Sequence, residues 1–140
     1  MSTSIRYTAV PVIALVILGM LDASGVSASP GDSSATPSCA FILSKPAVST
    51  LTDGVQAVTA TVRATACTGL AQPQSTTVCV SPTGSNGRCS SDAGWNANQA
   101  VYPAATAPRG EYTATAVGCY NVAGRPFPIC APLPASATTF

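Results

Sequence analysis

The sequence predicts an all-β protein, an antiparallel β-sandwich whose hairpins are each closed by one disulfide. Three observations support this class. Each consecutive pair of the six cysteines is centred on a turn signal, two long segments alternate apolar and polar residues, and no convincing helical period follows the amino-terminal region. The predicted disulfides are Cys39–Cys67, Cys79–Cys89 and Cys119–Cys130.

Residues 1–28 have the three parts of a secretory signal peptide. Arg6 precedes an apolar stretch from Ala9 to Leu21, and small residues lead to a cleavage position after Ala28. The apolar stretch is shorter than the roughly 20 residues of a membrane-spanning helix, so cleavage is favoured over a retained anchor. We therefore expect a secreted protein, extracellular or in the cell envelope, with no stable membrane span after cleavage.

The rest of the chain has the composition of a flexible leader over residues 29–38 and one domain over residues 39–140. Only 8% of the residues are charged and the net charge is +1, which gives no field for binding nucleic acid or an anionic membrane. Ala, Val and Thr dominate, so the core is expected to be poorly filled. Three disulfides, each worth roughly 2–4 kcal/mol, would compensate for it.

The first hairpin is predicted from two constraints that agree. Residues 55–66 alternate, and reflecting this strand about Asp53 places Val58 opposite Val48, and Ala64 opposite Ile42. The same register brings Cys39 opposite Cys67. A three-residue loop, with Gly54 in the left-handed conformation, would close the hairpin. Pro46 cannot donate to a ladder and is expected at an edge or a break. The residues predicted to face the core are Val58, Ala60, Val62, Ala64 and Ala66.

The middle cysteine pair is predicted from spacing. Residues 76–81 have the pattern of a strand, and a wide loop closed by Cys79–Cys89 would contain Asn86-Gly87 as a local kink. Residues 91–98 are expected to be loop and residues 100–102 a short strand.

The last hairpin starts from a second alternating segment, residues 110–120. Tyr112, Ala114 and Ala116 share its core face. Gly124-Arg125 is predicted as a type II′ turn, which places Cys119 opposite Cys130. The returning segment, residues 126–134, contains four prolines and is expected to be an irregular or edge strand.

With these strands placed, the chain resembles small exported immunoglobulin-like β-sandwich proteins of high-GC Gram-positive bacteria. Residues 110–117 are similar to the penultimate-strand motif of such domains. Ser49-x-Leu51-x-Asp53-Gly54 and the Cys79–Cys89 spacing also resemble the neocarzinostatin-like apoproteins, which sequester a reactive chromophore. The likeness covers about a third of the chain. The Cys39–Cys67 pair and the wider last cysteine loop depart from that family, and no cleft residue matches it.

The residue inventory argues against an enzyme. The chain has no histidine, which removes the usual general base and most zinc sites, and Lys45 is its single lysine. Asp53, Asp92 and Glu111 are explained by turns, loops and a polar strand face. No cysteine pair has C-x-x-C spacing. We expect no catalytic residue, metal or cofactor.

The most site-like stretch is Trp95-Asn96-Ala97-Asn98-Gln99, with Tyr102 nearby. A Trp flanked by amides in a loop could stack on a sugar or contact a partner. The alternative, which the small core favours, is that Trp95 folds back over an end of the sandwich. The predicted contact residues are Trp95, Asn96, Asn98, Tyr102 and Arg88.

These features predict an exported, non-enzymatic domain whose loops present a binding surface. Its partner would be a protein, a glycan or a small apolar ligand. Two other functions remain open at this point. One is a secreted protease inhibitor that uses the Cys79–Cys89 loop, and the other is a structural protein of the cell envelope.

Overall fold

The computed structural model describes residues 35–140, so the predicted signal peptide and most of the predicted leader lie outside the described residues. The described part contains nine strands and no helix, and therefore no helix that could cross a membrane. The strands are β1 (Ser38–Leu43), β2 (Ala47–Thr50), β3 (Gln56–Thr68), β4 (Ala71–Pro82), β5 (Arg88–Ala93), β6 (Asn98–Pro103), β7 (Glu111–Val122), β8 (Ile129–Pro132) and β9 (Ser136–Thr139).

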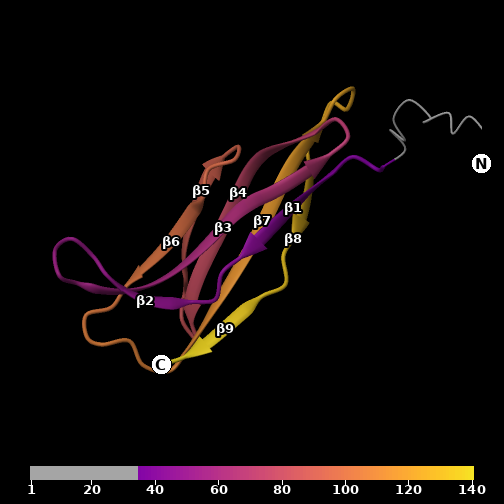
Figure 1. The fold of residues 1–140 in the computed structure, drawn as a ribbon. Helices are drawn as coiled ribbons and strands as arrows, with labels where there is room; N and C mark the ends of the chain where they lie inside the picture. The colour runs from indigo at the N-terminus through magenta and orange to yellow at the C-terminus, as the bar shows by residue number, and fades with distance from the viewer. Residues whose placement is uncertain (1–34) are drawn as a thin grey trace, which may run out of the picture. The chain divides into compact units, whose positions relative to one another are not determined.

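The strands form two antiparallel sheets that face each other as a sandwich (Figure 1). In the first sheet, β3 is central, with β6 on one edge and β1 and β2 sharing the other. In the second sheet the order is β5-β4-β7, and β8 and β9 share the outer edge of β7. The predicted all-β class and its two-sheet arrangement are confirmed.

The core between the sheets is made almost entirely of small and β-branched side chains. The one large ring in this core is Tyr112. Three partly exposed side chains, Leu43, Tyr102 and Leu133, pack against the edge of the core. Because most of these side chains are small, the apolar area that each removes from water is modest. The buried cluster consists of Val58, Ala60, Val62, Val78, Val80, Ala100, Tyr112, Ala114 and Ala116. Ala66, which was predicted to share this face, is exposed.

All three predicted disulfides are present, and each joins residues that face each other in a ladder. The first hairpin closes as predicted. Leu51 N donates to Val55 O at 2.8 Å, Gly54 N donates to Leu51 O at 2.9 Å, and Gly54 has a φ of 79°. Pro46 lies in the break between β1 and β2, as its missing N–H requires.

The predicted pairing of Ile42 with Ala64 is wrong by one residue. Ala40 faces Ala66, but Phe41 faces Ala64, so Thr65 is an extra residue in β3. This β-bulge turns the Phe41 ring inward onto Gly118 of the opposite sheet, where a Cβ atom would lie 2.5 Å from ring carbons. Ile42 instead points outward and is 53% exposed.

The other two hairpins differ from the prediction in their loops. Residues 91–93, which were expected to be loop, belong to β5, where Thr77 Oγ1 lies 2.8 Å from Ser91 Oγ. This edge strand has no large apolar side chain on either face and so shows no clear alternation. The turn at Gly124 is not type II′. Arg125 N donates to Val122 O at 3.0 Å, which makes Gly124 the third residue of its turn.

Candidate functional site

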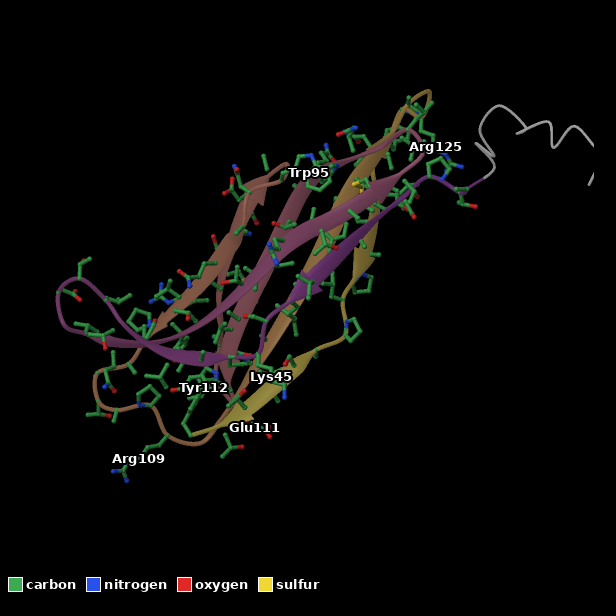
Figure 2. All side chains as sticks on the ribbon, viewed as in Figure 1. Lys45, Trp95, Arg109, Glu111, Tyr112 and Arg125 are labelled. Carbon is green, nitrogen blue, oxygen red and sulfur yellow. A yellow bond between two sulfur atoms is a disulfide. The ribbon has the colours of Figure 1, made fainter. Side chains whose placement is uncertain are left out.

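Trp95 lies in the turn between β5 and β6, and Gly94 N donates to Gln74 O at 2.8 Å at the base of that turn. The indole is 52% exposed and takes no part in the buried cluster. The indole is therefore not a core side chain, and about half of it is open to solvent. Asn96 is also exposed in this turn. Figure 2 shows Trp95 far from Arg109 and Tyr112.

Asn98 has a structural role that the sequence did not reveal. Its side chain is 3% exposed and joins the two sheets. Nδ2 donates to Thr76 O and to Ser90 O, both at 2.9 Å, and Oδ1 accepts from Ser90 Oγ at 2.7 Å. Since its side-chain hydrogen bonds are made within the domain, Asn98 has no free group to offer a ligand.

Arg88 and Trp95 do not share a surface along β5. Arg88 begins this strand opposite Val80, and Trp95 follows the other end. At about 3.3 Å per residue, the two positions are roughly 20 Å apart along the chain direction. The five predicted contact residues therefore do not form one site.

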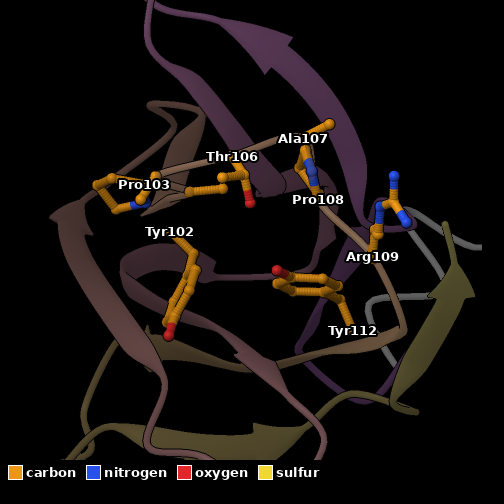
Figure 3. Close-up of a pocket in the computed structure, with 9 residues that line it drawn as sticks. Tyr102, Pro103, Thr106, Ala107, Pro108, Arg109 and Tyr112 are labelled. Atoms are coloured by element: carbon orange, nitrogen blue, oxygen red, sulfur yellow. The ribbon is translucent and has the colours of Figure 1, made fainter.

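Tyr102 is the one predicted residue that lines a substantial hollow. This hollow, which we call the aromatic hollow, has a volume of about 340 Å³ and lies beneath the segment that joins β6 to β7 (Figure 3). The Tyr102 and Tyr112 rings meet edge to face, with centroids 5.9 Å apart and planes at 70°. The lining of the aromatic hollow consists of Tyr102, Pro103, Ala104, Ala105, Thr106, Ala107, Pro108, Arg109 and Tyr112.

The hollow exists because the segment above it has small side chains that leave the space open, and prolines that cannot donate backbone hydrogen bonds to a neighbouring strand. Pro103 and Pro108 lack an N–H, and each of the three alanines between them has a single side-chain carbon, which fills little space. The segment is fixed at both ends: Ala104 N donates to Gln56 O at 2.9 Å, and Gly110 N donates to Phe140 O at 3.0 Å.

A third ring supports the floor of the hollow from the far side. The Phe140 ring lies edge to face with Tyr112, at a centroid distance of 5.8 Å. Tyr112 is therefore held between two rings, and its position is well determined by packing. In Figure 3 the hydroxyl groups of Tyr112 and Thr106 point toward the space beneath the segment, whereas the Tyr102 hydroxyl points away.

The charged groups around the hollow are few. Arg109 is the one charged side chain in its lining, and Figure 2 shows it extending away from the body of the domain. Glu111 is exposed next to Tyr112, and its Oε1 accepts from Thr83 Oγ1 at 3.3 Å. Among residues 35–140, no three His, Cys, Asp or Glu side chains gather where they could hold a metal ion. The lining is thus suited to holding a guest by its rings and hydroxyl groups.

The hollow was only partly predictable. The nearness of Tyr102 to Trp95 in the sequence predicts it as a contact residue, and the predicted core position of Tyr112 is confirmed, but neither prediction indicates that the two rings meet beside a hollow. The remaining lining is mostly Ala and Pro, which carry no chemical signal. Comparison with protein-family models, curated proteins and solved structures gives no match for this chain. Functional inference therefore rests on the geometry of the domain.

Proposed function

We propose that this chain is an exported, non-enzymatic binding domain whose ligand-binding site is the aromatic hollow. The observation that carries the proposal is the partly exposed Tyr102 ring, set edge to face against the buried Tyr112, beneath a proline- and alanine-rich segment that leaves about 340 Å³ open. That volume is at the lower end of the range for ligand pockets, so the guest is one ring-sized group.

The chemistry of the lining narrows the guest to a ring with an apolar face. Tyrosine faces attract such rings, whether aromatic or the apolar side of a sugar, through dispersion and ring electrostatics. The Tyr112 and Thr106 hydroxyl groups, which point toward the hollow, would orient a polar edge of the guest (Figure 3). Export is supported by the three disulfides, because such bonds persist in oxidising compartments.

The alternative of a protease inhibitor is less well supported by the geometry. Binding hot spots at protein interfaces are enriched in large side chains such as Trp, Tyr and Arg, so a strong inhibitory loop would be expected to present one at its tip. At the tip of the Cys79–Cys89 loop, residues 83–87 are Thr, Gly, Ser, Asn and Gly. The large side chain of this loop, Arg88, belongs to β5, where it pairs with Val80 in the ladder and does not lie at the tip. We therefore favour the aromatic hollow over the Cys79–Cys89 loop.

The proposal is tested by titrating the oxidised protein with ring probes while recording two-dimensional NMR spectra. The probes are phenol, indole and methyl glucoside. At least one is expected to shift the resonances of Tyr102, Tyr112 and Thr106, and Tyr102→Ala should weaken its binding at least tenfold. Trp95→Ala is the matched control, because it removes an exposed aromatic ring elsewhere and should leave the affinity unchanged. Shifts that follow Trp95 instead of Tyr102 would refute the assignment.

A further inference from the structure

Phe127 is the most exposed large apolar side chain of the described residues, at 77%. It lies in the loop between β7 and β8, and Ala123 N in the same loop donates to Leu70 O at 3.2 Å. Leu70, in the turn between β3 and β4, is itself exposed. Two large apolar side chains are thus displayed on neighbouring turns at one end of the sandwich.

The loop that displays Phe127 is held in place before it meets any partner. The Cys119–Cys130 disulfide closes its base, and the ladder continues to the pair Tyr120 and Ile129. A turn from Val122 to Arg125 and prolines on both sides of Phe127 limit the remaining backbone freedom. Docking of Phe127 would therefore lose little conformational entropy.

This loop and the aromatic hollow lie at opposite ends of β7. Tyr112 is the second residue of that strand, and the loop follows its last residue. The separation along the strand is about 33 Å at roughly 3.3 Å per residue. Figure 2 shows Arg125 at one end of the domain, and Tyr112 and Arg109 at the other. Phe127 therefore cannot reach the hollow of its own chain.

We propose that Phe127 of one copy enters the aromatic hollow of a second copy, so that the domains associate head to tail. This inference rests on the proposed function, because it names the guest of the same hollow. A phenyl ring is a ring-sized group with apolar faces, and the partly exposed ring of Tyr102, held in place by the buried Tyr112, is a suitable partner for it. Since the two surfaces are different and lie at opposite ends, repetition gives an open row of copies.

Two features make this association weak and nearly independent of salt. One ring and a few neighbouring side chains bury far less than the area of a standard stable interface. The loop that carries Phe127 holds one cation, Arg125, and the lining of the hollow holds one charged side chain, Arg109, so no attraction between opposite charges adds to the contact. A lipid bilayer is a poorer partner for Phe127. Insertion into lipid would not benefit from a rigid loop, and the single cation of this loop would attract an anionic membrane only weakly.

The test is sedimentation of the oxidised protein at rising concentration, with two variants that each remove one surface. Wild type should form dimers and longer species as concentration rises. Phe127→Ala, which lacks the inserted ring, and Tyr102→Ala, which lacks part of the hollow, should each stay monomeric. Their equimolar mixture should form a dimer and nothing larger, because the Phe127 of one variant can enter the intact hollow of the other. Trp95→Ala should associate as wild type does.

Several results would overturn the proposal. These are a wild type that stays monomeric at every concentration, self-association that survives Phe127→Ala, or a mixture that stays monomeric. Ala105→Trp blocks the hollow without removing a core ring, and replaces Tyr102→Ala if that variant unfolds. Cosedimentation with phosphatidylcholine–phosphatidylglycerol vesicles that depends on Phe127 would assign the ring to lipid instead. The ring probes are titrated into Phe127→Ala, so their binding there would uphold the proposed function even if association fails.

Discussion

Gly118→Ala tests the register of the first sheet and the packing between the two sheets. The new Cβ atom would lie 2.5 Å from two carbons of the Phe41 ring and 2.7 Å from a third. Ordinary carbon contacts are about 3.5–4.0 Å, so the ring or the strand must move by roughly 1 Å. Overpacking of this kind costs about 1–3 kcal/mol.

We expect a loss near the middle of that range, because the Phe41 ring is half-buried and can move partway toward solvent. For a domain of this size, 1 kcal/mol corresponds to a change in Tm of roughly 4–8 °C. Gly118→Ala should therefore lower the Tm of the oxidised protein by about 10 °C, measured by the loss of ellipticity on heating.

A double-mutant cycle identifies the cause. Phe41→Leu removes most of the ring, so Gly118→Ala should cost much less in that background than in the wild type. Ile42→Ala is the matched control from the neighbouring position, and it should change the free energy of unfolding by no more than about 0.5 kcal/mol. A Gly118→Ala protein that melts within about 2 °C of wild type, or an Ile42→Ala loss as large as that of Gly118→Ala, would refute the reasoning.

Two further predictions concern the side-chain hydrogen bonds and the disulfides that connect the strands. Asn98→Ala leaves Thr76 O and Ser90 without their buried partner and should lower the free energy of unfolding, measured with denaturant, by about 2–4 kcal/mol. Asn96→Ala, in the exposed turn, should leave it almost unchanged. Equal effects would argue against the structural role of Asn98. Replacing each cysteine pair by alanines should rank the disulfides by loop length. Removing the Cys39–Cys67 disulfide, whose cysteines are 28 residues apart, should lower the free energy of unfolding by about 3.6 kcal/mol. Removing either disulfide with a separation of 10 or 11 residues should lower it by about 2.7 kcal/mol. A reversed order would show that native-state strain outweighs chain entropy.

The sequence was informative wherever two constraints coincided. The register that joins Cys39 to Cys67 also holds for Val48 and Val58, because the extra residue Thr65 in β3 is offset by an extra residue in the break around Pro46. Between these points the register differs by one, and no sequence pattern reveals a bulge that is later compensated. The inward residue there is consequently Phe41.

The aromatic hollow was harder to predict because it depends on what side chains lack. Ala105 and Ala107 matter because their small side chains leave space beside Tyr102, and Pro103 and Pro108 because they have no N–H to pair. Asn98 illustrates the converse. It lies in a polar stretch that has the composition of a binding loop, yet its amide is fully used inside the domain. Composition alone cannot distinguish a polar group that faces solvent from one that joins two sheets.

The distribution of large side chains connects stability with the proposed function. The core is built from Val and Ala around the single ring of Tyr112, while Trp95, Leu70 and Phe127 are exposed. A small core leaves little margin against unfolding, and three disulfides supply several kcal/mol by constraining the unfolded chain. Because that contribution needs no buried apolar area, large side chains can remain at the surface without loss of the fold. A domain stabilised in this way can expose Phe127 at one end and leave Tyr102 partly open in the aromatic hollow at the other, which is the arrangement that head-to-tail binding requires.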